Sequence, residues 1–198
     1  MDNVQRLKAL QRECSNCRVC AIGGKKTPEG DDANVLSDMN ISNIGIMIVG
    51  QNPGREECKQ RVPFVGASGK TFDALMEKHA GIKRGEVYVC NCVNCYTPLN
   101  RKPTELEINN CSAFLSQQIA IIQPKLVVSL GGTALRALTG LNGIMKYHGH
   151  IQYSYMYNVK IFPLIHPSPR NLNIPEKRQM FCDDLGLLRS ALKKLGVR

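Results

Sequence analysis

Cysteine is the residue type with the most evident chemistry in this sequence. Nine cysteines fall in two close groups and at three isolated positions: Cys14, Cys17 and Cys20; Cys90, Cys92 and Cys95; and Cys58, Cys111 and Cys182. An odd number argues against a closed disulfide framework, and the first twenty residues carry charges without the apolar run of a targeting signal. We therefore expect the cysteines to be reduced, in an intracellular compartment.

A second set of candidate residues consists of polar side chains that directly follow apolar runs. They occur at three places: Gly50-Gln51-Asn52-Pro53-Gly54, Asn91, and His166-Pro167-Ser168-Pro169. Runs of this kind are typical of strands buried on both faces of a sheet. Because ligands of open α/β sheets bind beyond the carboxyl ends of the strands, we expect these residues to share one site.

Four apolar runs predict the strands that position these residues, and they alternate with stretches of helical periodicity. The runs are 44–50, 87–91, 126–130 and 159–165, and the helical stretches are 70–79, 105–122, 134–138 and 175–195. This alternation predicts a three-layer α/β/α fold with a central, mainly parallel four-stranded sheet. We expect residues 1–198 to form one domain with an N-terminal cysteine-containing helix and a surface loop over 23–43.

The charge balance indicates a polyanionic partner. Lysine and arginine number 26 against 16 aspartates and glutamates, which gives a formal charge of +10 and a pI near 9.3. Charge alone leaves nucleic acid, an anionic membrane surface and a phosphorylated metabolite open as partners. No apolar stretch approaches the length of a membrane span, so none is expected.

The order of the motifs resembles that of family 4 (iron–sulfur) uracil-DNA glycosylases, within the uracil-DNA glycosylase superfamily. The motifs are Gly50-Gln51-Asn52-Pro53-Gly54, Pro63-Phe64-Val65-Gly66, Asn91 with Cys95 shortly after it, and His166-Pro167-Ser168. The resemblance implies a monofunctional hydrolase of base excision repair. Such an enzyme flips uracil out of single- or double-stranded DNA and hydrolyses the N-glycosidic bond to leave an abasic site.

The resemblance places Gly50, Phe64 and Asn91 in the base-binding pocket. Phe64 would stack on the flipped pyrimidine, Asn91 would bond its O4 and N3 edge, and His166 would donate to O2 as negative charge grows there. Taken singly, the phenylalanine has an equal claim to be a core residue, and the asparagine and histidine are typical of structural strand ends. Their assignment to one pocket favours the functional interpretation.

Gln51 departs from the family pattern, which has glutamate there in a role that handles the hydrolytic water. A carboxamide cannot act as a general base. We therefore expect Asn52 to position the water, as in related branches with Gly-x-Asn-Pro-Gly, and we expect slower turnover. Two alternatives stay open: a catalytically weakened, glycosylase-like DNA-binding or replication accessory protein, and an enzyme for another deaminated base such as hypoxanthine or xanthine.

The resemblance also implies a [4Fe–4S] cluster on four cysteines. Cys95 and Cys111, sixteen residues apart, match two of the ligand positions. An N-terminal pair completes the set; Cys14/Cys17 and Cys17/Cys20 both have the required two-residue gap, and we expect Cys17 and Cys20, with Cys14 as the alternate to Cys20. Zinc on the same four thiolates is the alternative cofactor.

The loop after His166 is expected to contact DNA. Ser168 would grip a phosphate, Arg170 would contact a phosphate or groove, and Leu172 would enter the minor groove as an apolar wedge. We expect a monomer in the cytoplasm or at the nucleoid. A replication clamp or a polymerase as a further partner is left open.

Overall fold

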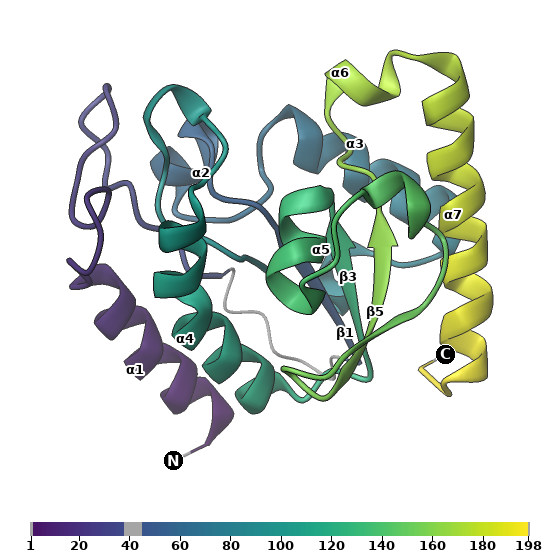
Figure 1. Ribbon diagram of the computed structural model, residues 1–198, viewed down its shortest axis with the longest axis horizontal. Helices are drawn as coiled ribbons and strands as arrows, with labels where there is room; N and C mark the ends of the chain where they lie inside the picture. The colour runs from purple at the N-terminus through teal and green to yellow at the C-terminus, as the bar shows by residue number, and fades with distance from the viewer. Residues whose placement is uncertain (1, 38–44, 198) are drawn as a thin grey trace.

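The computed structural model describes residues 2–37 and 45–197, in which a five-stranded sheet lies between two layers of helices (Figure 1). The strand order is β2-β1-β3-β5-β4, and every pairing is parallel except that of β4 with β5. The strands are β1 (Ile46–Gly50), β2 (Tyr88–Asn91), β3 (Leu126–Leu130), β4 (Gln152–Ser154) and β5 (Val159–Leu164). The expected three-layer architecture is confirmed, with one strand more than the four predicted.

The additional strand is β4, which the apolar runs did not reveal. It has three residues, of which Tyr153 is exposed, and it lies at the edge of the sheet. A short edge strand exposed on one side has no continuous apolar run. Because it pairs antiparallel with β5, the two strands form a hairpin.

Helices cover both faces of the sheet. α1 (Asn3–Ser15), α4 (Glu105–Ile122) and α5 (Gly132–Thr139) pack on one face, and α3 (Ala67–Leu75) and α7 (Pro175–Lys194) on the other. The shorter elements are α2 (Arg55–Gln60), α6 (Pro169–Leu172), the π-helical turn η1 (Met76–Ala80), and the 3-10 turns η2 (Arg84–Glu86), η3 (Pro98–Asn100) and η4 (Ile144–Lys146). In Figure 1, α1 and α4 lie side by side, and α7 lies at the far side of the sheet. Within the described ranges no helix is long and apolar enough to cross a membrane.

Alternate residues of β1 supply the cores on the two faces of the sheet. Ile46 and Ile48 pack with the side chains of α3 and α7, whereas Met47 and Val49 pack with those of α1 and α4. Successive side chains of a strand point to opposite faces, so a strand covered on both sides must be apolar throughout. The resulting rigid strand ends at Gly50, where the candidate site begins.

The start of α4 is fixed by a reciprocal cap. The Thr104 hydroxyl accepts a hydrogen bond from the backbone N–H of Glu107 at 3.2 Å, and the Glu107 carboxylate accepts one from the N–H of Thr104 at 2.8 Å. Such a capping box satisfies donors that the first helical turn leaves unpaired. The cap sets the register of α4 and with it the buried position of Cys111.

Residues 33–37 differ from the surface loop expected over 23–43. Val35 donates its backbone N–H to the Asn94 carbonyl at 2.7 Å, and Tyr96 donates to the Ala33 carbonyl at 2.7 Å. These bonds pair the segment with the chain beyond β2, and residues 33–37 are buried. The mixed composition of the segment concealed this pairing, which is made through the backbone. Residues 38–43 lie outside the described residues.

Candidate active site

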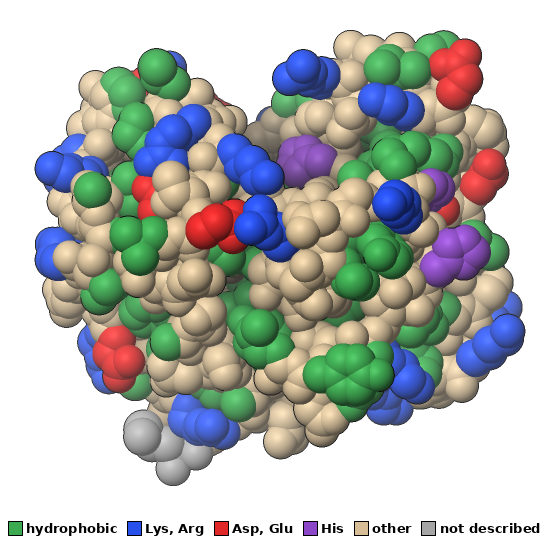
Figure 2. Space-filling model, in the orientation of Figure 1, with side chains coloured by type: hydrophobic (Ala, Val, Ile, Leu, Met, Phe, Trp, Pro, Cys, Tyr) green, Lys and Arg blue, Asp and Glu red, His purple; other side chains and the backbone are tan. Residues whose placement is uncertain are grey.

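A pocket of about 500 Å³ opens beyond the carboxyl ends of β1, β2 and β5. Figure 2 shows it as a hollow between two raised parts of the surface, with a histidine inside. Its polar and aromatic lining includes Gln51, Asn52, Glu57, Phe64, Ser68, Asn91, Asn100, His166, Ser168 and Arg170. The structure therefore brings the three polar strand ends of the sequence to one place.

Gly50 lets the two expected base-recognition side chains approach the end of β1. A Cβ atom at position 50 would lie 2.2 Å from Cε2 of Phe64 and 2.5 Å from Oδ1 of Asn91. Both distances are far below van der Waals contact, so position 50 has room for no side chain. The parallel register pairs Gly50 with Asn91, which brings the asparagine beside it.

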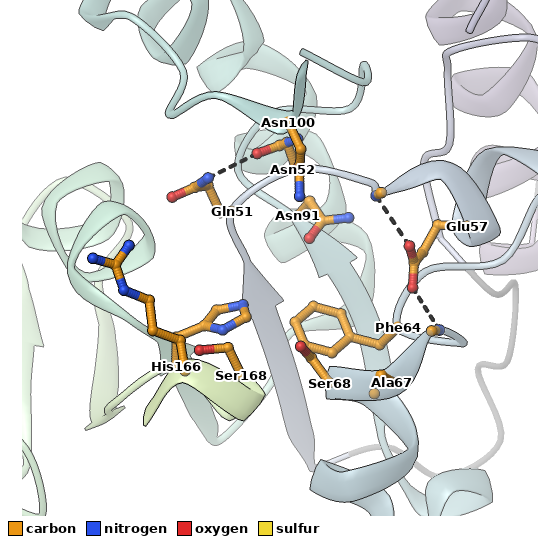
Figure 3. Close-up of a pocket in the computed structure, with 14 residues that line it drawn as sticks. Gln51, Asn52, Glu57, Phe64, Ala67, Ser68, Asn91, Asn100, His166 and Ser168 are labelled. Atoms are coloured by element: carbon orange, nitrogen blue, oxygen red, sulfur yellow. Dashed lines mark hydrogen bonds between the residues drawn. The ribbon is translucent and has the colours of Figure 1, made fainter. Parts of the chain in front are cut away.

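Phe64 and His166 face the pocket from different elements. Their ring centroids are 6.3 Å apart with an interplanar angle of 39°, and Figure 3 shows both rings directed into the space below Asn91. Phe64 has a positive φ of 56° and its carbonyl accepts a hydrogen bond from Arg84 at 3.3 Å, which helps hold this backbone conformation. Burial lowers the pKa of His166, so the imidazole is neutral at pH 7.

Asn91 carries an unsatisfied carboxamide at the back of the pocket. The residue is 1% exposed, and neither Oδ1 nor Nδ2 has a hydrogen-bond partner among the described residues. Leaving a buried polar group unpaired costs roughly 1–3 kcal/mol. A folded protein tolerates such a cost where a ligand supplies the missing partners.

Gln51 and Asn52 form a short chain of hydrogen bonds. The Thr133 hydroxyl donates to Oε1 of Gln51 at 2.7 Å, and Nε2 of Gln51 donates to Oδ1 of Asn52 at 2.9 Å (Figure 3). Nδ2 of Asn52 in turn donates to the Pro53 carbonyl at 3.0 Å and to Oδ1 of Asn100 at 3.5 Å. These contacts fix the orientation of Asn52 at the pocket wall.

Glu57 is a site residue that the sequence motifs did not single out. Its carboxylate accepts hydrogen bonds from the backbone N–H groups of Gly54 at 3.0 Å, Val65 at 3.0 Å and Gly66 at 2.7 Å. It thus ties the turn after β1 to the loop that carries Phe64 (Figure 3). A glutamate three residues after the helix-capping Gly54 is the signal that sequence reasoning missed.

The loop after His166 is only partly as expected. Ser168 and Arg170 line the pocket, and Asn171 donates from Nδ2 to the His166 carbonyl at 2.8 Å. Leu172 is 3% exposed and packs in the core with residues of α7 such as Phe181. The prediction of Leu172 as an apolar wedge is therefore corrected, because the short helix α6 turns this side chain inward.

Five cysteines gather between α1, α4 and the segment after β2. Cys14, Cys95 and Cys111 are buried, whereas Cys17 and Cys20 are partly exposed. Nδ2 of Asn34 donates to Sγ of Cys14 at 3.0 Å and to Sγ of Cys95 at 3.6 Å.

The electrostatics of the thiols agree with this grouping. Burial, together with the nearby thiols of Cys95, Cys20 and Cys14, raises the pKa of Cys111 to about 12. Burial likewise raises the pKa of Cys14 to about 12. In the part of the chain that is described, no three metal-binding side chains converge closely enough to enclose a single ion.

Comparisons with known proteins converge on one family. A family model for the uracil DNA glycosylase superfamily matches residues 36–186. The type-4 uracil-DNA glycosylase of Thermotoga maritima is 33% identical over 193 residues, which cover 96% of each chain. The type-4 enzyme of Sulfurisphaera tokodaii is 32% identical over 197 residues, covering 96% of this chain and 84% of the relative. A DNA polymerase of Bacillus phage SP01 is 32% identical over 152 residues, 75% of this chain and 16% of that protein.

Proposed function

Because this chain belongs to the uracil-DNA glycosylase superfamily, we propose that it acts as a monofunctional uracil-DNA glycosylase in DNA repair. The observation that carries the assignment is the buried carboxamide of Asn91, which has no hydrogen-bond partner in the described part of the chain and lies in a pocket with Phe64 and His166. An extruded base supplies both a hydrogen-bonding edge and an aromatic face to such a pocket. We also propose that the chain is a single-domain monomer with uracil-containing DNA as its partner.

Asn91 is the residue that we expect to read the base. Its Oδ1 accepts from N3–H of uracil, and its Nδ2 donates to O4. Cytosine presents an acceptor at N3 and an amino donor at position 4, so it offers the opposite pattern. A carboxamide that presents this pattern beside Gly50 rejects cytosine, because two buried donors or two buried acceptors would face each other.

His166 stabilises the leaving group in this proposal. The C1′–N1 bond breaks, its electron pair leaves with the uracil ring, and negative charge grows on O2. A neutral imidazole donates a hydrogen bond to that oxygen, and the lowered pKa keeps His166 in the neutral form. Phe64 stacks on the ring and keeps water away from its face.

Asn52 positions the water that attacks C1′. The oxygen of that water forms the new bond to C1′ and keeps one proton as the hydroxyl group. The second proton passes to solvent, since the carboxamides of Gln51 and Asn52 do not act as bases. Gln51 acts as a positioning residue, held by Thr133 and bonded to Oδ1 of Asn52. We expect Asn52→Ala to slow uracil excision by about tenfold or more, and an unchanged rate would contradict this role.

The five gathered cysteines support a [4Fe–4S] cluster, which would fasten α1, the segment after β2 and α4 to one another. We propose Cys17, Cys95, Cys111 and a fourth ligand from the N-terminal group. The fourth ligand that we favour is Cys14 in place of Cys20, because Cys14 is buried and shares the Asn34 amide with Cys95.

Iron content separates the two cysteine registers and the two cofactors. Anaerobically purified protein should contain iron and sulfide and absorb visible light. Cys14→Ser should lose the iron, whereas Cys20→Ser and the distant control Cys182→Ser should keep it. Colourless protein with one zinc per chain would exclude the cluster, and iron loss in Cys20→Ser but not Cys14→Ser would restore the other register.

Uracil excision is measured directly on oligonucleotides. Single- and double-stranded DNA with one uracil is incubated with the protein, treated with alkali and examined for cleavage, with His166→Ala as the control. Parallel substrates with hypoxanthine or xanthine test the base preference. Tight binding without cleavage of any of these substrates would favour a glycosylase-like accessory protein, for which the missing carboxylate at Gln51 is the supporting observation.

A further inference from the structure

Leu99 is an apolar side chain held in open solvent beside the base pocket. It is 89% exposed and adopts a left-handed backbone conformation with φ of 54° and ψ of 21°. The next residue, Asn100, also has a φ of 54°. Residues other than glycine rarely adopt positive φ angles, because the Cβ atom clashes with the backbone. Such a strained conformation persists where the surrounding structure imposes it.

Hydrogen bonds on both sides impose this conformation. The N–H of Asn100 donates to the Thr97 carbonyl at 2.8 Å, and the Thr97 hydroxyl donates to the Arg101 carbonyl at 2.5 Å. The Arg101 guanidinium makes two bonds to the Glu107 carboxylate, at 2.6 and 2.8 Å. The turn 97–101 is therefore fixed to the start of α4, and it displays Leu99 on a rigid support.

The turn 97–101 forms part of the pocket rim. Asn100 lines the base pocket and contacts Asn52, and Figure 3 shows it above the pocket. Leu99 lines an adjoining groove of about 430 Å³, which shares Glu57, Gly66 and Asn100 with the pocket. Among the described residues, Leu99 is the one exposed large apolar side chain that lines either cavity.

Two other strongly exposed apolar residues lie away from the pocket. Tyr155 and Met156 belong to the turn that precedes β5, whereas the pocket lies beyond the carboxyl end of that strand. Leu172, which follows the histidine motif, is buried. Leu99 thus combines strong exposure with a position at the pocket rim, which suits contact with the base stack around a flipped nucleotide.

We propose that Leu99 inserts into the DNA duplex at the place that the extruded uracil leaves, and so keeps the base from returning. The inference rests on the proposed glycosylase function. Extrusion opens an apolar gap between neighbouring base pairs, and a leucine that fills the gap removes its own apolar surface from water. The rigid turn means that little conformational freedom is lost when the side chain inserts.

Single- and double-stranded substrates separate this role from catalysis. A single strand has no opposing base and little stack to restore, so Leu99→Ala should excise uracil from it at the rate of the parent protein. On a duplex the same variant should be slower by about tenfold or more. The loss should be larger for uracil opposite adenine than for uracil opposite guanine. The uracil–guanine mismatch is the weaker pair, so it opens more readily and depends less on Leu99.

Leu187→Ala is the matched control, since it removes a half-exposed leucine from α7 on the far side of the sheet. Leu99→Met should recover most of the duplex rate, because it restores an apolar side chain of similar volume. Equal rates for Leu99→Ala and the parent on duplex DNA, or equal losses on both substrates, would overturn the role of Leu99. A parent protein that excises uracil from neither substrate would overturn the proposed function itself.

Discussion

Replacing Asn91 with leucine should make the protein more stable and the enzyme nearly inactive. Leucine keeps the branched outline of asparagine but has no polar atoms. Both polar atoms of Asn91 are buried without a partner among the described residues, so the substitution removes one unsatisfied polar group, the carboxamide. The stability and the activity should therefore change in opposite directions.

The magnitudes follow from the same carboxamide. An unsatisfied buried polar group costs roughly 1–3 kcal/mol, so the free energy of unfolding should rise by about that amount. For a chain of this length, each kcal/mol corresponds to about 2–4 °C in Tm, which gives a rise of roughly 2–12 °C. Loss of two hydrogen bonds to uracil should remove about 2–4 kcal/mol of transition-state binding, a decrease of ~30- to 1000-fold in kcat/KM.

Gln118 provides a matched control with a satisfied carboxamide. It is fully buried in α4, accepts a hydrogen bond from the Tyr88 hydroxyl at 2.9 Å and donates to the Phe114 carbonyl at 3.2 Å. Gln118→Leu should therefore lower the free energy of unfolding by about 1–3 kcal/mol, because the tyrosine hydroxyl loses this partner. Its distance from the pocket lining should leave uracil excision unchanged.

The assay combines thermal and urea unfolding with single-turnover excision of uracil. An Asn91→Leu protein that loses stability as Gln118→Leu does would refute the argument that the Asn91 carboxamide is an unsatisfied group awaiting a ligand. Excision at the parental rate would refute its role in base recognition. Asn91→Ala repeats the activity measurement with a smaller side chain, which separates loss of hydrogen bonds from crowding by leucine.

Three further predictions concern the walls of the pocket. Burial lowers the pKa of His166 in the folded protein, so as the pH falls the unfolded chain takes up a proton on this histidine before the folded chain does. The free energy of unfolding of the parent should therefore fall relative to that of His166→Gln between about pH 7.5 and 5.5, and a constant difference in Tm would contradict this. Glu57→Gln turns an amide N–H₂ toward backbone N–H donors and should lower the free energy of unfolding by roughly 1–3 kcal/mol, seen as a lower urea midpoint. Thr133→Val removes the hydrogen bond to Oε1 of Gln51 and should lower kcat about tenfold with little effect on KM. A raised KM at constant kcat would argue against a positioning role for Gln51.

The four parallel strands were predictable because a strand buried on both faces of a sheet appears in the sequence as a short, continuous apolar run. The runs that became β1, β2, β3 and β5 are mostly apolar and buried, and β1, β2 and β5 end at or just before a polar motif. The register that places Asn91 beside Gly50 follows from parallel pairing. The meeting of the polar strand ends in one pocket was therefore available from the sequence.

The residues that escaped prediction depend on contacts between segments. The polar, proline-rich sequence that precedes Leu172 is typical of an exposed loop, but α6 directs the Leu172 side chain toward α7. The spacing of Glu57 from Gly54 indicates a helix cap, but its hydrogen bonds to the loop at Val65 and Gly66 depend on the fold. Leu99 stands out only once its exposure and its left-handed conformation are known. Tertiary context decided each of these cases.

The bare backbone at Gly50 limits how the pocket can diverge in evolution. Phe64 and Asn91 both rest against this position, so any side chain acquired there would displace both at once. A lineage that shifts its preference toward a larger damaged base must therefore change other walls first. Ala67 and Ser68, at the start of α3, line the pocket and do not belong to the strand that builds both cores. Substrate range can drift at these two positions while the fold is inherited unchanged.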